Sequence, residues 1–170
     1  MSLSGIEKFR APYEGALKKF EAYFQSQVGQ FEPELKETVA DVLKHPGKRL
    51  RPMFVLGVAG LAEAQKERSW KIAAIVEFIH LATLVHDDIL DSAQTRHGAT
   101  SHYIKFGPQV SVLTGDTLFL RANELAATEE DVRVGRLVAA AAKATCSGEI
   151  AQSLTARENI RISYESAPCL

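Results

Sequence analysis

Asp87-Asp88-Ile89-Leu90-Asp91 places three carboxylates close together near the middle of the chain. On a helix, residues four apart face the same way, so Asp87 and Asp91 would project about 6 Å apart along the axis. Carboxylates at this separation repel unless a cation lies between them, and oxygen ligands with room for water suit Mg²⁺. The alternative is a solvated helix end, but acidic groups at a helix C-terminus oppose the helix dipole. The placement favours a metal site made by Asp87, Asp88 and Asp91.

The second candidate is the basic segment Gly47-Lys48-Arg49-Leu50-Arg51-Pro52. Its three cations lie within four residues, between a glycine and a proline, so they can converge on one phosphate group. Taken alone, a short basic cluster is more often a solvated surface. Both interpretations stay open at this point.

Three further candidates are weaker when each is considered alone. His80 lies in an apolar segment, where a histidine is usually a core residue, yet on an ideal helix it falls within about 20° of Asp87. Arg96-His97-Gly98 begins five residues after Asp91 and is expected on the loop beyond the acidic cluster. Gln152 is available to contact a phosphate or a metal-bound water, although a surface glutamine is the simpler interpretation.

Helical patterns surround these candidates and strand-like alternation is weak, so the sequence predicts an all-α protein with one domain over residues 1–170. The strongest helix is expected over residues 69–91, with Ser69 as N-cap and an interior that is apolar on nearly every face. Other helices are expected over residues 5–28, 33–44, 53–64, 116–128 and 131–156. Asp116 and Asp131 are the expected caps of the last two. A polar connection over residues 92–115 contains a break at Phe106-Gly107-Pro108.

Composition excludes several classes of function. Twenty basic and 21 acidic side chains leave a net charge of −1, so a global basic field for nucleic acid is absent. The only cysteines, Cys146 and Cys169, cannot form a disulfide framework or a four-cysteine zinc site within one chain. No uncharged run approaches the length of a membrane span, and the N-terminus lacks the apolar core of a signal peptide. We expect a cytoplasmic protein.

The motifs GKRLRP, EFIHLATLVHDDILD, RHG, FG, GD and GEIAQ follow one another in this order. Together they resemble the N-terminal half of the trans-polyprenyl diphosphate synthases, over roughly residues 30–156. The resemblance implies an incomplete isoprenoid-synthase-type helical bundle with a deep central cavity. It also implies Mg²⁺ as cofactor, isopentenyl diphosphate and an allylic diphosphate as substrates, and a homodimer.

The resemblance assigns substrate contacts to individual residues. Lys48, Arg51 and His80 match residues that hold isopentenyl diphosphate. His97 stands where the family usually has a second arginine, so this contact to isopentenyl diphosphate is expected to depend on pH. Gln152 matches a glutamine on the helix that faces the allylic site.

The acidic cluster and the arginine that follows it match the family's catalytic end. Asp87 and Asp91, with Asp88 beside them, match its first magnesium-binding motif. Arg96 matches the arginine that binds the allylic diphosphate. The resemblance therefore implies that Asp87, Asp91 and Arg96 are the catalytic residues.

Departures from the family pattern shape the expected activity. The family carries a second aspartate-rich motif and a Lys-Thr pair downstream, whereas the only later acidic run here, Glu129-Glu130-Asp131, does not fit. We expect a truncated prenyltransferase that is inactive as an isolated chain, and the alternative is a non-catalytic subunit of a heteromeric synthase. GKRLRP argues against a class I terpene cyclase, which has no isopentenyl diphosphate to hold. Ala82 and Thr83 replace the bulky aromatic residues that stop elongation in the family, so a long-chain product is expected.

Overall fold

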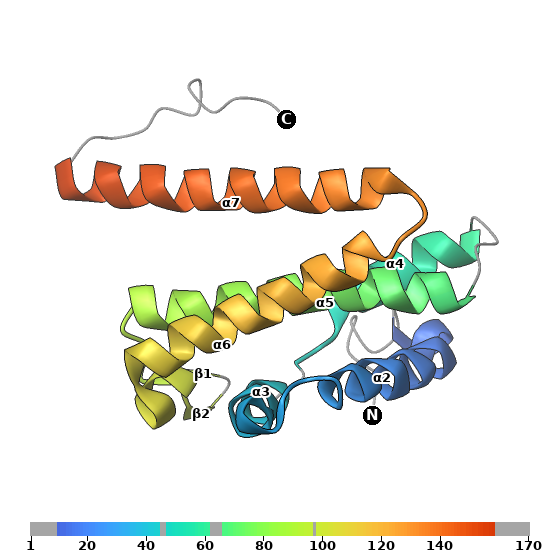
Figure 1. Ribbon diagram of the computed structural model, residues 1–170, viewed down its shortest axis with the longest axis horizontal. Coiled ribbons are helices and arrows are strands. Elements are labelled where there is room, and N and C mark those ends of the chain that lie inside the picture. The colour runs from blue at the N-terminus through green and yellow to red at the C-terminus, as the bar shows by residue number, and fades with distance from the viewer. Residues whose placement is uncertain (1–9, 45–46, 62–65, 97, 159–170) are drawn as a thin grey trace. The chain divides into compact units, whose positions relative to one another are not determined.

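The computed structural model describes residues 10–44, 47–61, 66–96 and 98–158, and the chain divides into two compact units (Figure 1). The first unit runs to Thr128 and the second begins at Glu129. The α-helices of the first unit are α2 (Glu14–Val28), α3 (Lys36–Leu43), α4 (Leu50–Leu61), α5 (Lys66–Leu90) and α6 (His102–Ala127). Two 3-10 turns, η1 (Ala11–Tyr13) and η2 (Pro33–Leu35), precede α2 and α3. The predicted all-α class is confirmed.

Helix α5 is the centre of the first unit, where it packs against α2, α4 and α6. Figure 1 shows α6 lying alongside it. Phe78 of α5 is fully buried, and its ring centroid lies 4.5 Å from that of Phe24 in α2 and 6.2 Å from that of Phe31. Because helices cover α5 on several sides, its sequence is apolar on nearly every face. Packing on several sides therefore holds α5 in place, together with the polar residues that it carries.

Two helices begin earlier than the sequence predicts. Helix α5 starts at Lys66, so Ser69 lies inside it, 7% exposed, and its expected role as N-cap is wrong. Helix α4 starts at Leu50 rather than Met53. Pro52 fits this start because it stands in the first turn, where a helical backbone N–H has no partner within the helix.

Helix α6 also begins earlier, inside the expected polar connection. The Oγ of Ser101 accepts a hydrogen bond from the backbone N–H of Ile104 at 3.3 Å and caps the helix there. The predicted break is present but local, because Gly107 adopts φ 79° and Pro108 restarts the helix without needing an N–H donor. Asp116 consequently lies well inside α6, and its expected role as a cap is wrong.

A short hairpin joins α5 to α6. Strand β1 (Thr95–Arg96) pairs antiparallel with β2 (Ala99–Thr100), in the register Thr95↔Thr100 and Arg96↔Ala99. Strands of two residues are too short to show the alternation by which a sequence reveals a strand. The hydroxyl of Ser101 donates to the carbonyl of Ala93 at 2.6 Å and closes the base of the hairpin.

The second unit contains helix α7 (Val132–Glu158). Asp131 precedes it, and its Oδ1 accepts a hydrogen bond from the backbone N–H of Arg133 at 3.0 Å, as expected for a residue that caps the helix. Among the helices that the structure describes, none combines the length and the apolar character that a membrane crossing needs.

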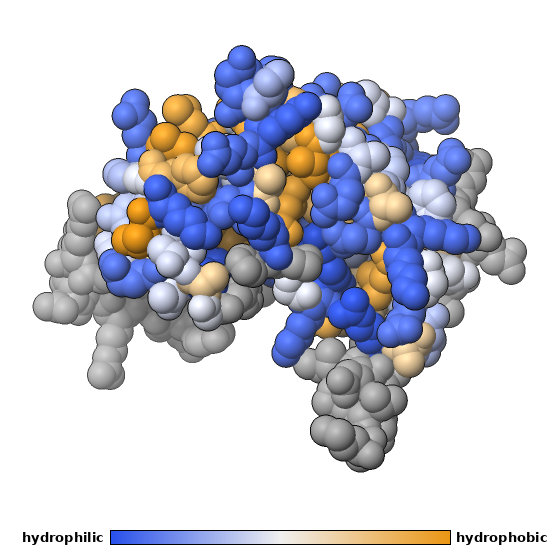
Figure 2. Space-filling model, turned by 90° about the horizontal axis from the view of Figure 1, so that it is seen from below, coloured by the Kyte–Doolittle hydropathy of each residue, from blue (hydrophilic) through white to orange (hydrophobic). Residues whose placement is uncertain are grey.

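Hydrophilic side chains cover much of the face seen from below in Figure 2, with apolar side chains visible between them. Helix α2 contributes to this pattern because its apolar residues point inward. Leu17, Phe20 and Phe24 are buried, whereas Lys18 and Lys19 between them are exposed. The predicted amphipathic character of this helix is therefore present.

Candidate active site

The two outer carboxylates of the predicted metal site lie one helical turn apart at the end of α5. The backbone N–H of Asp91 donates to the carbonyl of Asp87 at 2.8 Å, so helical geometry continues to Asp91. Asp87 is half-buried and Asp91 is exposed. Burial raises the pKa of Asp87, and the carboxylates of Asp91 and Asp88 raise it further, whereas the charge of Arg96 lowers it. A cation bound here would relieve the repulsion among these groups.

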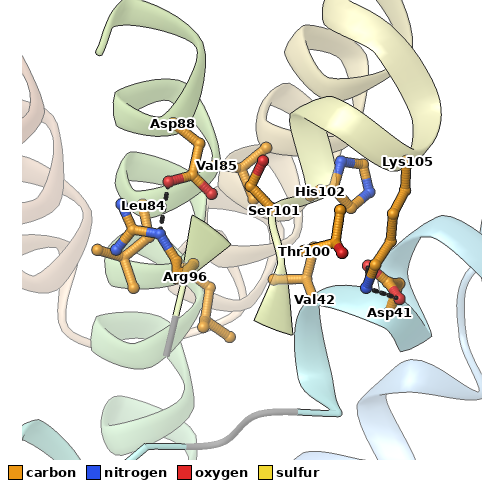
Figure 3. Close-up of a pocket in the computed structure, with 11 residues that line it drawn as sticks. Asp41, Val42, Leu84, Val85, Asp88, Arg96, Thr100, Ser101, His102 and Lys105 are labelled. Atoms are coloured by element: carbon orange, nitrogen blue, oxygen red, sulfur yellow. Dashed lines mark hydrogen bonds and ion pairs between the residues drawn. The ribbon is translucent and has the colours of Figure 1, made fainter. Parts of the chain in front are cut away.

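Asp88, the middle carboxylate, has a different environment. It is 2% exposed, and its Oδ1 accepts a hydrogen bond from Nε of Arg96 at 2.6 Å (Figure 3). Arg96 lies on β1, the first strand of the hairpin, rather than on an irregular loop. A role for Asp88 as a metal ligand stays a prediction, and the ion pair with Arg96 disfavours it.

With Asp88 paired to Arg96, Asp87 and Asp91 are the predicted metal ligands that remain, and they suit a hard cation only in part. Within the described ranges, no group of three His, Cys, Asp or Glu side chains is arranged to hold a metal ion. Asp87 and Asp91 offer carboxylate oxygens from adjacent turns, and Mg²⁺ often takes only one or two carboxylates together with phosphate oxygens and water. These residues therefore fit a magnesium ion that is bound with a diphosphate, rather than one held by the protein alone.

Lys48, Arg51 and His80, the predicted contacts to isopentenyl diphosphate, line one hollow of about 620 Å³, here called the cationic pocket. Its lining residues are Lys44, Gly47, Lys48, Arg49, Leu50, Arg51, Glu77, His80, Leu81 and Leu84. Lys48 and Arg51 are exposed at the start of α4, and His80 is half-buried on α5. The structure thus brings together three predicted residues from two segments of the chain.

Arg49, the third cation of the basic segment, is oriented differently from its neighbours. It is 5% exposed, and its guanidinium pairs with Glu21 of α2 and Glu77 of α5. The expectation that all three cations converge on one phosphate is therefore wrong for Arg49, because its donors are engaged inside the protein.

A smaller hollow of about 50 Å³, here called the hairpin pocket, lies beside Asp88 and Arg96 (Figure 3). It is lined by Asp41, Val42, Leu81, Leu84, Val85, Asp88, Arg96, Thr100, Ser101, His102 and Lys105. Leu81 and Leu84 line both this pocket and the cationic pocket. The two pockets therefore share an apolar wall on α5, with the exposed cations Lys48 and Arg51 beyond one side of it and the Asp88–Arg96 pair beyond the other.

Sequence reasoning missed the other polar residues of the hairpin pocket. Lys105 Nζ donates to the two carboxylate oxygens of Asp41 at 3.0 and 3.2 Å, which ties α3 to α6. His102 is buried, its Nδ1 lies 2.8 Å from Oγ of Ser111, and burial lowers its pKa. No local pattern could have revealed the Asp41–Lys105 pair, because its members are 64 residues apart in the sequence.

His86, the residue before Asp87 in α5, contacts α6. Its Nε2 lies 3.2 Å from the carbonyl oxygen of Val112 and 3.5 Å from Oδ1 of Asp116. A Cβ atom added at Gly115 would lie 2.3 Å from the same Nε2, which is closer than two atoms can approach without movement. Gly115 therefore makes room for His86, a role that the sequence did not reveal.

Two predicted substrate contacts remain predictions. His97 lies outside the described residues, and nothing in the structure bears on its proposed pH dependence. Gln152 is exposed on α7, in the second unit of the chain.

The residues expected to control product length, Ala82 and Thr83, line neither the cationic pocket nor the hairpin pocket. Ala82 is 2% exposed, and the hydroxyl of Thr83 donates to the carbonyl oxygen of His80 at 2.8 Å. Leu81 and Leu84, rather than Ala82 and Thr83, supply the α5 wall of both pockets. Packing therefore accounts for the small size of Ala82.

Comparisons with known proteins match this arrangement to one family. The sequence profile of the Polyprenyl synthetase family matches residues 32–167. Solanesyl-diphosphate synthase 2 of Oryza sativa is 35% identical over 146 residues, which are 82% of this chain and 36% of that protein. Heptaprenyl diphosphate synthase component 2 of Geobacillus stearothermophilus is 36% identical over 135 residues, 79% of this chain and 41% of that protein.

A solved structure agrees with these sequence matches. The polyprenyl synthase of Caulobacter crescentus, in complex with calcium and isoprenyl diphosphate, is 30% identical with a TM-score of 0.79, over 88% of this chain and 46% of that one. The chain thus spans less than half the length of each of these three proteins. Since the family profile covers most of its residues, the chain belongs to the polyprenyl synthetase family.

Proposed function

We propose that this chain carries the isopentenyl diphosphate site and the first aspartate motif of a trans-prenyltransferase that makes a long-chain polyprenyl diphosphate. One observation carries the proposal: Lys48, Arg51 and His80 line a single pocket on the helix whose end bears Asp87 and Asp91. Family membership supports the class of reaction, because the curated relatives are named as prenyl diphosphate synthases.

The cationic pocket would bind the diphosphate of isopentenyl diphosphate. The ammonium of Lys48 and the guanidinium of Arg51 match a diphosphate in charge and in hydrogen-bonding capacity, and His80 adds a third contact. Leu81 and Leu84 would then lie against the hydrocarbon part of the substrate. Their apolar wall would exclude water, which otherwise destroys a carbocation.

At the other end of α5, the allylic diphosphate would be held for ionisation. A magnesium ion held by Asp87 and Asp91 would stabilise the negative charge that develops on the departing diphosphate. Arg96 would direct its remaining N–H donors to the same group, since only its Nε is bonded to Asp88. The double bond of isopentenyl diphosphate would then attack the allylic cation, and no protein nucleophile is needed. The calcium and isoprenyl diphosphate of the Caulobacter structure support this pairing of cation and diphosphate.

A long-chain product is supported by the names of the relatives, solanesyl and heptaprenyl diphosphate synthases. The absence of bulky aromatic residues at Ala82 and Thr83 agrees with it, although these residues pack within the helix bundle. The homodimer and the cytoplasmic location expected from the sequence stay predictions.

A non-catalytic subunit of a heteromeric synthase is the second candidate function. It is favoured by the name of the Geobacillus relative, which is one component of its synthase. Gel filtration of the purified chain, alone and with each candidate partner, separates the two: a catalytic homodimer elutes at twice its own mass without a partner.

Binding and turnover test the main proposal separately. Isothermal titration of isopentenyl diphosphate into the purified 170-residue chain should show binding, and Lys48→Ala should abolish most of it. The expressed gene product, with its length verified by intact mass, should condense isopentenyl diphosphate with farnesyl diphosphate only if it includes the second half of the family's site. Absence of binding by the wild-type chain, or robust condensation by a verified 170-residue product, would contradict the proposal.

A further inference from the structure

We infer that Arg49 is a positioning residue for the cationic pocket, which fixes the turn carrying Lys48 and Arg51 against the helix that carries His80. This inference rests on the proposed function, because it concerns how the same pocket is shaped to bind a diphosphate. The sequence placed Arg49 among the phosphate contacts, whereas its position in the structure points to another task.

The side chain of Arg49 is clamped between two helices. Its Nε and Nη2 donate to the two carboxylate oxygens of Glu21 in α2, each at 3.1 Å, so the pair is bidentate. Its Nη1 donates to Oε1 of Glu77 in α5 at 2.6 Å, and only 4% of each of these two side chains is exposed. The guanidinium carbon lies 4.8 Å from the ring centroid of Phe24. Four contacts thus determine where Arg49 lies.

The backbone at Arg49 also requires such anchoring. Its φ is 51°, in the left-handed region that residues with a side chain seldom adopt and that persists where surrounding contacts enforce it. The carbonyl of Arg49 accepts a hydrogen bond from the N–H of Met53 at 3.1 Å, so this residue also starts the hydrogen-bonding of α4. The direction of α4, and with it the position of Arg51 in its first turn, depends on Arg49.

In α5, the carboxylate that holds Arg49 belongs to Glu77, which lies close to His80, the third predicted substrate contact of the cationic pocket. Glu77 precedes His80 by three residues, and residues at this spacing are neighbours on a helix surface. Burial raises the pKa of Glu77, whereas the hydrogen bond from Arg49 and the charges of Arg49 and Arg51 lower it. The Arg49–Glu77 pair therefore sets the separation between the two cations of the turn and His80.

A direct contact between Arg49 and substrate is disfavoured by its burial. Two carboxylates already receive three of its hydrogen bonds, and a diphosphate that approached it would lie close to Glu77 and be repelled. Lys48 and Arg51, which are exposed, are the groups available to a ligand.

Isothermal titration of isopentenyl diphosphate into the purified chain tests the inference. Arg49→Met should weaken binding about 10- to 100-fold, the size of effect found when a residue that orients metal ligands is removed. Because this variant also leaves two carboxylates without their partner and removes a positive charge, a second variant is needed.

The double variant Arg49→Met/Glu77→Met supplies that control. It removes one charge of each sign, so the net charge is unchanged, and it replaces the buried pair by side chains that pack without hydrogen bonds. If its melting temperature returns towards that of the wild type while binding stays weak, Arg49 acts by positioning. If its affinity equals that of the wild type, the inference is overturned.

A matched variant elsewhere in the same unit completes the test. Arg121 joins α6 to α2 through a 2.7 Å hydrogen bond from its Nη2 to Oε1 of Gln27, away from both pockets. Arg121→Met should lower the melting temperature without changing the affinity for isopentenyl diphosphate. Absence of binding by the wild type would overturn the proposed function together with the inference, whereas wild-type affinity in the double variant would overturn the inference alone.

Discussion

The basic segment before α4 and the acidic end of α5 each carry three like charges, and in both the middle charge is buried and paired. Arg49 is 5% exposed between Lys48 and Arg51, and Asp88 is 2% exposed between Asp87 and Asp91. The outer members of each triplet are exposed or half-buried. Each segment also has one left-handed residue that is not glycine, Arg49 or Ser92, with φ 51° in both cases.

The basic segment and the acidic end of α5 differ in which groups stay accessible once the middle charge is paired. Glu77, the buried partner of Arg49, is 4% exposed, so this pair leaves little of the guanidinium open to a ligand, although both residues belong to the lining of the cationic pocket. The partner of Asp88, Arg96, keeps 31% of its side chain exposed, so this pair presents an oriented guanidinium to a ligand. A buried charge therefore positions neighbouring residues at the basic end, whereas at the acidic end it positions a group that can itself bind diphosphate.

The largest effect should come from the outer carboxylates. In the gene product that includes the complete site, Asp87→Ala or Asp91→Ala should lower turnover by about 100-fold or more, as loss of a group that stabilises developing charge does. Steady-state condensation assays measure this, and circular dichroism should show unchanged helix content. Glu37→Ala removes an exposed carboxylate on α3 that lines neither pocket, and this matched control should keep normal activity. Activity above a few per cent of wild type in either variant would contradict the metal assignment.

Removing the middle carboxylate should affect stability first. Asp88→Ala leaves Arg96 without its partner and should lower the free energy of unfolding by about 1–3 kcal/mol, the cost of removing one partner of a largely buried hydrogen bond. The KM for the allylic diphosphate should rise, because Arg96 is no longer oriented. Urea unfolding measures the first effect.

The control for Asp88→Ala is a longer ion pair in the same unit, whose lysine is exposed. Lys44 Nζ lies 3.7 Å from Oδ1 of Asp41, with 66% of the Lys44 side chain exposed. Lys44→Met should change the free energy of unfolding by less than about 1 kcal/mol. Equal losses in the two variants would show that the Asp88 pair has no special role.

A substitution at Gly115 tests whether the packing of His86 against α6 stabilises the protein. Gly115→Ala forces His86 to move and should lower the free energy of unfolding by about 1–3 kcal/mol. Gly60→Ala, in α4, meets no atom within 4 Å and should leave stability unchanged or raise it by up to about 1 kcal/mol. If Gly115→Ala were as stable as Gly60→Ala, His86 would not be held in place by α6.

The smallest expected effect is a loss of stability at low pH, which arises from His102, the buried histidine close to the acidic end of α5. Burial lowers the pKa of His102 from its ordinary value of 6.5, so below that pH the unfolded chain binds a proton that the folded protein does not. The free energy of unfolding should therefore fall as the pH falls below 6.5, by at most about 1.4 kcal/mol per pH unit. Urea unfolding at several pH values should show a shallower slope for His102→Gln than for the wild type. Identical slopes would contradict this origin.

Local patterns were enough to predict the helix that carries His80, Asp87 and Asp91, but not the hairpin that carries Arg96. The apolar run over residues 69–91 with its acidic end gave the position of α5 to within three residues, because burial on several faces leaves a distinct signature. The one-turn relation of Asp87 and Asp91 followed from helix geometry alone. The early start of α6 was missed because Gly107 and Pro108 signal a break even where a helix resumes at once.

The sequence by itself determined which residues could bind a diphosphate and a cation, because charge and spacing along one helix or one turn are local properties. Only the tertiary structure decided which charge of each triplet is buried and paired inside the protein. Arg49 is separated by 28 residues from both Glu21 and Glu77, and its burial depends on how α2 and α5 pack. Asp88 meets Arg96 only because the hairpin turns back at the end of α5. Burial and pairing are properties of the packed chain, so like charges one to three residues apart along it take different roles.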